Sequence, residues 1–344
     1  MSRSLVARRS ELADGVTSSG GPLLSGLRRL ATGQAVPLAA VIVAIAVASQ
    51  IDNSTFLSGD NVIALLRAAV TTFVIGAAST VLLTAGGLDL SIGGVFNLAA
   101  IVGAELMVHG MFWPLAFALG LLSGVVVGLV NAGLVIYLRV PPIISTLSTF
   151  YAVSGVAVII TGGNVLSPLP GGFNAIGQND LGPIPLLVIY AAVIGVVTHL
   201  LLAKSRFGYD VQAVGGNERA ARANGVSIQR IKLSVYALSG TAAALAGLLY
   251  AARTGAGDPQ AGGTDITFQV IAAVLIGGTS LFGGVGTVVG TAFGAILFSE
   301  IDNSLTIVGI NPLYQDVIVG VILAVAVALD SWRRRRVFEL ARGG

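Results

Sequence analysis

Several polar residues lie in a segment flanked on both sides by apolar sequence. The segment Thr84–Asn97 reads TAGGLDLSIGGVFN and places Asp89, Ser91 and Asn97 among four glycines. A carboxylate near hydrocarbon is costly and usually faces a cavity or a partner. Glycine-broken helices at membrane depth are tolerated where they are buried or line a cavity. We expect a pathway wall or a tight turn in which Asp89 caps the next helix, and the two are compatible.

A second polar segment, Asn217–Gly225, carries charges between apolar spans. Asn217 is a good helix N-cap, Glu218 favours a helix start, and Gly225 is placed to end the helix. Arg219 and Arg222 are three residues apart and share a helix face. The residues alone leave two interpretations open: a basic loop that only fixes topology, or a helix presented to a partner protein.

The sequence lacks the motifs of several enzyme classes. It contains no GxxxxGK[ST] phosphate loop, no HExxH and no GxSxG, so the chain should not hydrolyse nucleotide itself. The absence of cysteine and the presence of two histidines argue against a thiol enzyme or a zinc site. The acidic residues Glu105, Glu300 and Asp302 are too scattered to favour a proton relay. We therefore expect no catalytic residue, no bound metal and no cofactor.

The composition indicates a membrane protein of many spans. Of the 344 residues, 55% are hydrophobic and only 10% are charged, whereas soluble domains have about 25% charged residues. So few charges cannot cover a water-facing surface of this size. The 46 glycines suit closely packed transmembrane helices, and the glycine-rich stretch 277–294 predicts such packing in particular.

We predict an all-α polytopic fold with about ten transmembrane helices. A disordered basic tail at 1–34 precedes a transmembrane domain at 35–332, with a polar loop at 204–230, and a basic tail follows at 333–344. The eighth and ninth spans are short and could instead form a re-entrant hairpin. The expected spans are 36–51, 61–84, 88–108, 112–138, 143–161, 184–203, 229–252, 266–281, 285–301 and 313–330.

The positive charges orient these spans. With both termini in the cytoplasm, 17 of the 19 lysines and arginines fall on the inner side. The exceptions are Arg67, inside the second span, and Arg253, at the outer end of the seventh. An odd number of spans would place the C-terminal arginine run outside, against the positive-inside rule.

Four stretches, in this order, resemble the permease subunits of bacterial ABC importers for monosaccharides, the ribose-type permeases. They are GGLDLSIGG (86–94), PPIISTLST (141–149), AVGGNERAARANGVSIQRIKLSVYALSG (213–240) and IAAVLIGGTSLFGGVGTVVGTAFGAIL (271–297). The resemblance covers roughly residues 55–332. The superfamily also includes permeases for branched-chain amino acids and nucleosides.

The resemblance implies a permease in a bacterial inner membrane that moves a simple sugar and works with other chains. These are cytoplasmic ABC ATPase subunits that hydrolyse ATP, a second permease copy or paralogue, and an extracytoplasmic sugar-binding protein. Membrane lipid surrounds the chain, and no nucleic acid is expected. The resemblance favours the partner interpretation of the polar helix. The expected ATPase-coupling residues are Asn217, Glu218, Arg219, Ala221, Arg222 and Gly225.

The translocation pathway is expected at polar residues of the matching stretches and nearby, namely Asp89, Ser91, Asn97, Thr146, Thr149 and Gln269. The chain departs from the family pattern at Thr267 and Gln269, where acidic residues are frequent. It also departs at Asp302, where Asn is common, and at Asp265, where Gly is common. These departures leave the sugar open. Alternatives are a nucleoside, polyol or branched-chain amino acid as substrate, or an ion-coupled secondary transporter.

Overall fold

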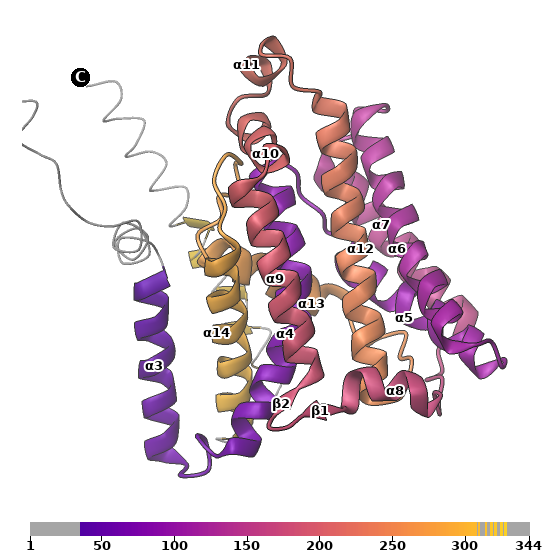
Figure 1. The fold of residues 1–344 in the computed structure, drawn as a ribbon, viewed down its shortest axis with the longest axis vertical. Helices are drawn as coiled ribbons and strands as arrows, with labels where there is room; N and C mark the ends of the chain where they lie inside the picture. The colour runs from indigo at the N-terminus through magenta and orange to yellow at the C-terminus, as the bar shows by residue number, and fades with distance from the viewer. Residues whose placement is uncertain are drawn as a thin grey trace, which may run out of the picture.

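A computed structural model describes residues 35–307 together with isolated positions between 309 and 328. The predicted tails at 1–34 and 333–344 and most of the predicted span at 313–330 lie outside the described residues. Within the described part, five helices are long and apolar enough to cross a membrane (Figure 1). They are α4 (Gly59–Thr84), α6 (Trp113–Ile136), α7 (Pro142–Thr161), α9 (Leu186–Lys204) and α12 (Ile228–Thr254).

Four further helices occupy predicted spans without meeting that standard. Three are apolar but shorter, and α14 carries two carboxylates, Glu300 and Asp302. Nine of the ten predicted spans therefore coincide with a helix, whereas the number of crossings stays a prediction. The four helices are α3 (Ala35–Asp52), α5 (Ile92–Val108), α13 (Gly263–Ile276) and α14 (Val288–Ile307).

Helix α5 packs against four other helices, α6, α7, α12 and α13. Its first turns are fully enclosed, with Ile92, Val95 and Phe96 at 0% exposure. The helix begins at Ile92, not at residue 88 as predicted, because residues 85–91 form a non-helical connection from α4. The polar residues before and at the start of α5 therefore lie inside the protein.

Glycines bring α6 and α12 into close, antiparallel contact. A Cβ on Gly120 would meet Leu248, one on Gly124 would meet Gly240 and Ala244, and one on Gly128 would meet Tyr236. The four-residue spacing places the three glycines along one face of α6, where small residues let backbones approach. This stripe was not among the sequence predictions, although its GxxxGxxxG spacing is visible in the sequence.

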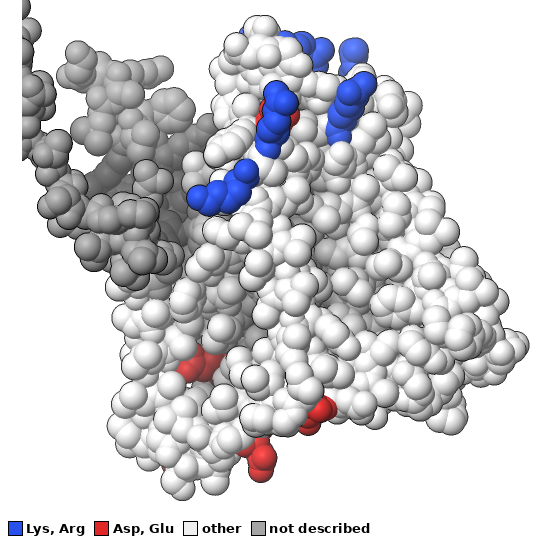
Figure 2. Space-filling model, in the orientation of Figure 1, with Lys and Arg blue, Asp and Glu red and all other residues white. Residues whose placement is uncertain are grey.

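The two ends of the bundle differ in structure. One end carries α10 (Arg206–Gly216) and α11 (Glu218–Ala223), and the other carries α8 (Gly171–Gln178) and an antiparallel hairpin (Figure 1). The hairpin pairs β1 (Asp180–Leu181) with β2 (Ile184–Pro185) and adds a small element to the predicted all-α fold. Blue basic side chains gather at the α10–α11 end, and red acidic ones lie toward the hairpin end (Figure 2).

The α13–α14 connection reaches the α10 end of the bundle. The Gly284 amide donates to the Thr84 carbonyl at the end of α4, and Gly215 of α10 lies against both residues. Between the two helices, Gly277 faces Gly290 and Gly294 faces Ala273, which confirms the close packing predicted for this stretch.

Candidate functional site

The short helix α11 begins and ends where the sequence predicts. The Asn217 side chain accepts from the Ala220 amide at 3.0 Å, as an N-cap does. At the other end Gly225 has φ +82°, the left-handed conformation that favours glycine. The amides of Gly225 and Val226 donate to the carbonyls of Arg222 and Ala221 at 3.0 and 3.1 Å, which is a complete Schellman motif. The helix is thus closed at both ends by local hydrogen bonds.

One face of α11 anchors it and another is free. Ala221, at 5% exposure, packs in a cluster that includes Val211 of α10 and Ile231 of α12. Its role is therefore to hold the helix, in contrast to the exposed Arg219 and Arg222. Among the described residues Arg219 makes no ion pair, so its charge is available to a partner chain.

The Glu218 carboxylate ties α11 to the start of α12. Lys232 Nζ lies 2.8 Å from Glu218 Oε2, and Arg222 Nη2 lies 3.7 Å from Glu218 Oε1. A push on α11 would therefore reach α12 through the Lys232 contact as well as through the packing of Ala221. The two contacts give the predicted coupling segment a physical connection to a central membrane helix.

Asp89 is enclosed in a hydrogen-bond network. Its Oδ1 accepts from the Ser91 amide at 2.8 Å and from the Ser91 hydroxyl, and its Oδ2 accepts from Ser239 Oγ at 2.8 Å. Asn131 Nδ2 donates to the same Ser91 hydroxyl at 2.8 Å. Asp89 therefore closes the turn before α5, as one interpretation predicted. It bonds the N-cap residue Ser91, however, and not an amide of the first helical turn.

Three more predicted pathway residues are buried with partners inside the protein. Asn97 Oδ1 accepts from the Gly262 amide at 2.7 Å. Thr146 accepts from the Leu90 amide at 3.0 Å, and Thr149 donates to a carbonyl of its own helix. Their part in a pathway stays a prediction, because these contacts also suffice to pack the helices.

Among the described residues no group of three or more His, Cys, Asp or Glu side chains could hold a metal ion.

Gln269 has a different environment, because it lines a polar cavity of about 370 Å³. The cavity lies between α4, α12, α13 and α14. Gln269 Nε2 donates to Asp302 Oδ2 at 2.9 Å across it, from α13 to α14. The lining residues that the pathway prediction did not include are Ala64, Leu65, Ala68, Thr71, Thr72, Tyr250, Arg253, Ile266, Ser299, Asp302, Asn303 and Thr306.

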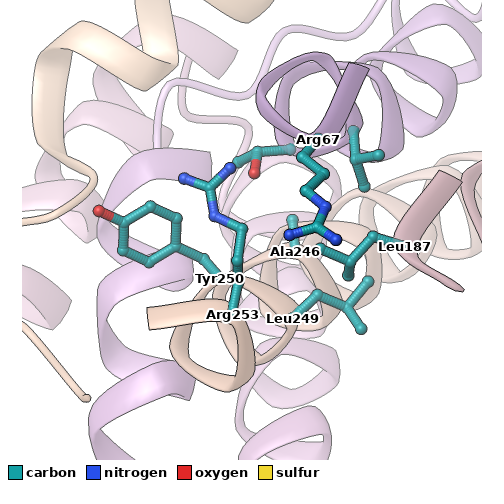
Figure 3. A pocket seen from close by; sticks show the side chains of 8 residues that line it. Arg67, Leu187, Ala246, Leu249, Tyr250 and Arg253 are labelled. Carbon is teal, nitrogen blue, oxygen red and sulfur yellow. The ribbon is translucent and has the colours of Figure 1, made fainter. Parts of the chain in front are cut away.

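The two arginines that break the positive-inside pattern come together beside this cavity. Arg67 of α4 and Arg253 of α12 line a pocket of about 10 Å³ (Figure 3), and Thr71, Tyr250 and Arg253 line both spaces. Arg67 pairs with Asp180 of β1 at 2.5 Å. Arg253 lies over the Tyr250 ring, with its Cζ 5.3 Å from the ring centroid. The sequence signal for this region was therefore the presence of two arginines, Arg67 and Arg253, that do not follow the positive-inside rule.

The chain matches the family described as "Branched-chain amino acid transport system / permease component" over residues 61–327. It belongs to this permease family. The permease is 34% identical to the ribose import permease protein of Bacillus subtilis, over 81% of this chain and 87% of the relative. It is 31% identical to the xylose transport system permease protein of Escherichia coli K12, over 95% and 98%. It is 35% identical to the E. coli K12 galactose/methyl galactoside import permease protein, over 83% and 90%. No solved structure gives a significant match.

Proposed function

We propose that this permease is the membrane-spanning subunit of an ATP-driven importer for a simple sugar delivered by an extracytoplasmic binding protein. The observation that carries the proposal is the similarity along more than four fifths of the chain to proteins named for ribose, xylose and galactose transport. The family description itself mentions branched-chain amino acids. The relatives' names favour a monosaccharide over an amino acid.

We infer that ATP is hydrolysed by a separate cytoplasmic ATPase that contacts α11. The helix is short, capped at both ends and exposes Arg219 and Arg222, which could bind acidic groups of a partner. Asn217 and Gly225 fix the ends of the helix, Ala221 anchors it, and Glu218 connects it to Lys232. A second permease copy or paralogue would complete the pore.

We further propose ten spans with both termini in the cytoplasm of a bacterial inner membrane. The gathering of basic side chains at the α10–α11 end supports this orientation (Figure 2). Because the chain has no cysteine, single-cysteine variants can report sidedness directly. A membrane-impermeant maleimide should label Asn179→Cys in intact cells and should label Ala223→Cys only after permeabilisation. The reverse pattern would overturn the orientation.

The transport proposal is tested by uptake into proteoliposomes that contain the permease, its ATPase and its binding protein. Radiolabelled ribose, xylose and galactose are offered separately, with leucine as the competing substrate class. We expect ATP-dependent uptake of at least one sugar and none of leucine. Uptake that continues after ATP depletion but stops with an ionophore would instead indicate an ion-coupled transporter.

A further inference from the structure

We propose that the polar cavity between α4, α12, α13 and α14 is a station in the permease that binds one monosaccharide during translocation. This inference rests on the proposed sugar-import function and names the residues that would hold the sugar. The principal contacts are Arg253 and Tyr250 of α12, Gln269 of α13 and Asp302 of α14.

The size of the cavity suits a single sugar ring. Small-molecule pockets generally enclose ~300–1,000 Å³, so a volume of about 370 Å³ lies near the lower limit. The adjoining pocket, at about 10 Å³, has room for little more than a water molecule. The larger space can therefore take a monosaccharide, and the smaller one does not extend it enough for a second ring.

The cavity offers hydrogen-bond donors and acceptors that the protein leaves unused. A guanidinium has five N–H donors, and within the described residues no hydrogen bond or ion pair engages the Arg253 side chain. Asp302 uses Oδ2 to accept from Gln269, whereas its Oδ1 has no hydrogen-bond partner among those residues. A sugar hydroxyl both donates and accepts, so it can bond to Asp302 and Arg253 alike. The Tyr250 ring already contacts Arg253 and Phe96, so it positions the guanidinium and offers the sugar its hydroxyl.

Of the two arginines, Arg67 has an ion-pair partner and Arg253 has none among the described residues, which explains why Arg253 is available to a ligand. Arg67, in the neighbouring pocket, is held by Asp180. Arg253 lines both the small pocket and the larger cavity, as Thr71 and Tyr250 do. In the described part of the chain no carboxylate lies at ion-pair distance from Arg253. Ionisable side chains in or at the ends of membrane spans are candidates for functional sites, among them solute pathways. Arg253 is thus the cation that remains for a ligand.

The charged groups of the lining can serve a sugar or an amino-acid zwitterion, and the choice of a sugar rests on the proposed function. An amino-acid zwitterion could pair its carboxylate with Arg253 and its ammonium group with Asp302. Its apolar side chain could lie against Ala64, Leu65 and Ala68. Asn303 is already paired with Asn61, and Thr306 donates to the Asp302 carbonyl. A sugar presents hydroxyls in several directions and can use Arg253, Gln269 and Asp302, so leucine is included in the test as the competing ligand.

The cysteine-free sequence provides a direct test on the full-length permease in liposomes. Ala68→Cys of α4 and Thr306→Cys of α14 place a thiol at the cavity. Ser79→Cys is the matched buried control on α4. His109→Cys, at the end of α5, is an exposed control that does not line the cavity. The rate of reaction with a small hydrophilic methanethiosulfonate is measured with and without ribose, xylose or galactose, and with leucine.

We expect both cavity thiols to react and at least one sugar to slow them by the factor 1 + [sugar]/Kd. Ser79→Cys should be unreactive, and His109→Cys should react at the same rate with and without sugar. Unreactive cavity thiols, protection by leucine alone, or no protection by any of the three sugars would overturn the inference. This assay needs no ATPase, so its result is separate from the uptake test of the proposed function.

A second arm measures selectivity in the uptake assay. Gln269→Ala and Asp302→Asn should change the ratio of uptake rates among the three sugars several-fold. Asp265→Asn, an exposed carboxylate one turn before Gln269 on α13, should leave the ratio unchanged. Suppose that wild-type uptake is ATP-dependent and that both cavity variants keep the wild-type ratio of uptake rates among the sugars. The assignment of the sugar site to this cavity is then wrong, and the import function stands. If the wild type moves no sugar, the import function itself fails.

Discussion

The Lys232 ammonium lies 2.8 Å from the Glu218 carboxylate and joins the exposed helix α11 to the membrane helix α12. Further along α12, Ser239 donates to Asp89 and Tyr236 donates to the Leu88 carbonyl. One helix therefore contacts both the predicted ATPase-facing segment and the non-helical connection between α4 and α5.

Reversal of the Glu218 charge should uncouple transport without unfolding the protein. Both side chains are partly exposed, so their ion pair should contribute only ~0.2–1 kcal/mol to stability. For Glu218→Lys we expect a nearly unchanged melting temperature and a several-fold loss of ATP-dependent uptake. The exchanged pair Glu218→Lys with Lys232→Glu restores the contact with opposite charges. Uptake that recovers in the double variant assigns the effect to the pair, whereas uptake that stays low assigns it to contact with the ATPase.

Gly215→Ala should disturb the contact of α10 with the end of α4 and with the α13–α14 connection. A Cβ there would meet the Thr84 carbonyl and the Gly284 amide, which are backbone atoms and cannot turn away. We expect reduced uptake and a lower melting temperature. Gly216→Ala is the matched control, since a Cβ at Gly216 meets nothing within 4 Å. Equal behaviour of the two variants would contradict the close contact.

Gly124→Ala should separate α6 from α12. Its Cβ would collide with the Gly240 carbonyl and with Ala244, and overpacking of this kind costs ~1–3 kcal/mol. Thermal denaturation in detergent should show a clear fall in melting temperature. Gly133→Ala on the same helix meets nothing within 4 Å and should be neutral or slightly stabilising. A stable Gly124→Ala variant would show that the helices are further apart.

Asp89→Ala should destabilise the permease, because it removes the acceptor of three hydrogen bonds. The hydroxyls of Ser91 and Ser239 would lose this partner inside the protein, at ~1–3 kcal/mol for each group left unsatisfied. Asp89→Asn keeps one acceptor oxygen and should be milder. Thermal denaturation is measured beside uptake. Lost uptake at full stability would instead favour the pathway role predicted for Asp89.

Local features were the part of the structure that the sequence predicted well. Asn217 and Gly225 delimit α11 because capping depends on neighbouring backbone groups. The helices α8 and α10 and the β1–β2 hairpin were not predicted, since they lie in polar loops or, for β2, at the edge of a predicted span, where hydropathy gives no signal. The start of α5 was wrong by four residues, because an apolar segment can continue through a non-helical stretch that is buried in protein.

Among the pathway candidates, the sequence marked polar residues but could not group them. Asp89 and Ser91 are neighbours in sequence and share one network, as their spacing allowed. Gln269 and Asp302 were each noted as departures from the family pattern, yet nothing in the sequence indicated that they touch. Arg253 stood out only as a charge on the unexpected side.

By itself, the sequence determined that this chain is a helical membrane permease, and it predicted a polar coupling segment on the basic side. Hydropathy, charge asymmetry and short motifs suffice for that, because each depends on local composition. Only the tertiary structure brought Arg253, Gln269 and Asp302 to one cavity from three helices. In a membrane protein both the lipid-facing and the protein-facing surfaces of a helix are apolar. The sequence pattern therefore leaves each helix's rotation and neighbours open, and side-chain packing decides them.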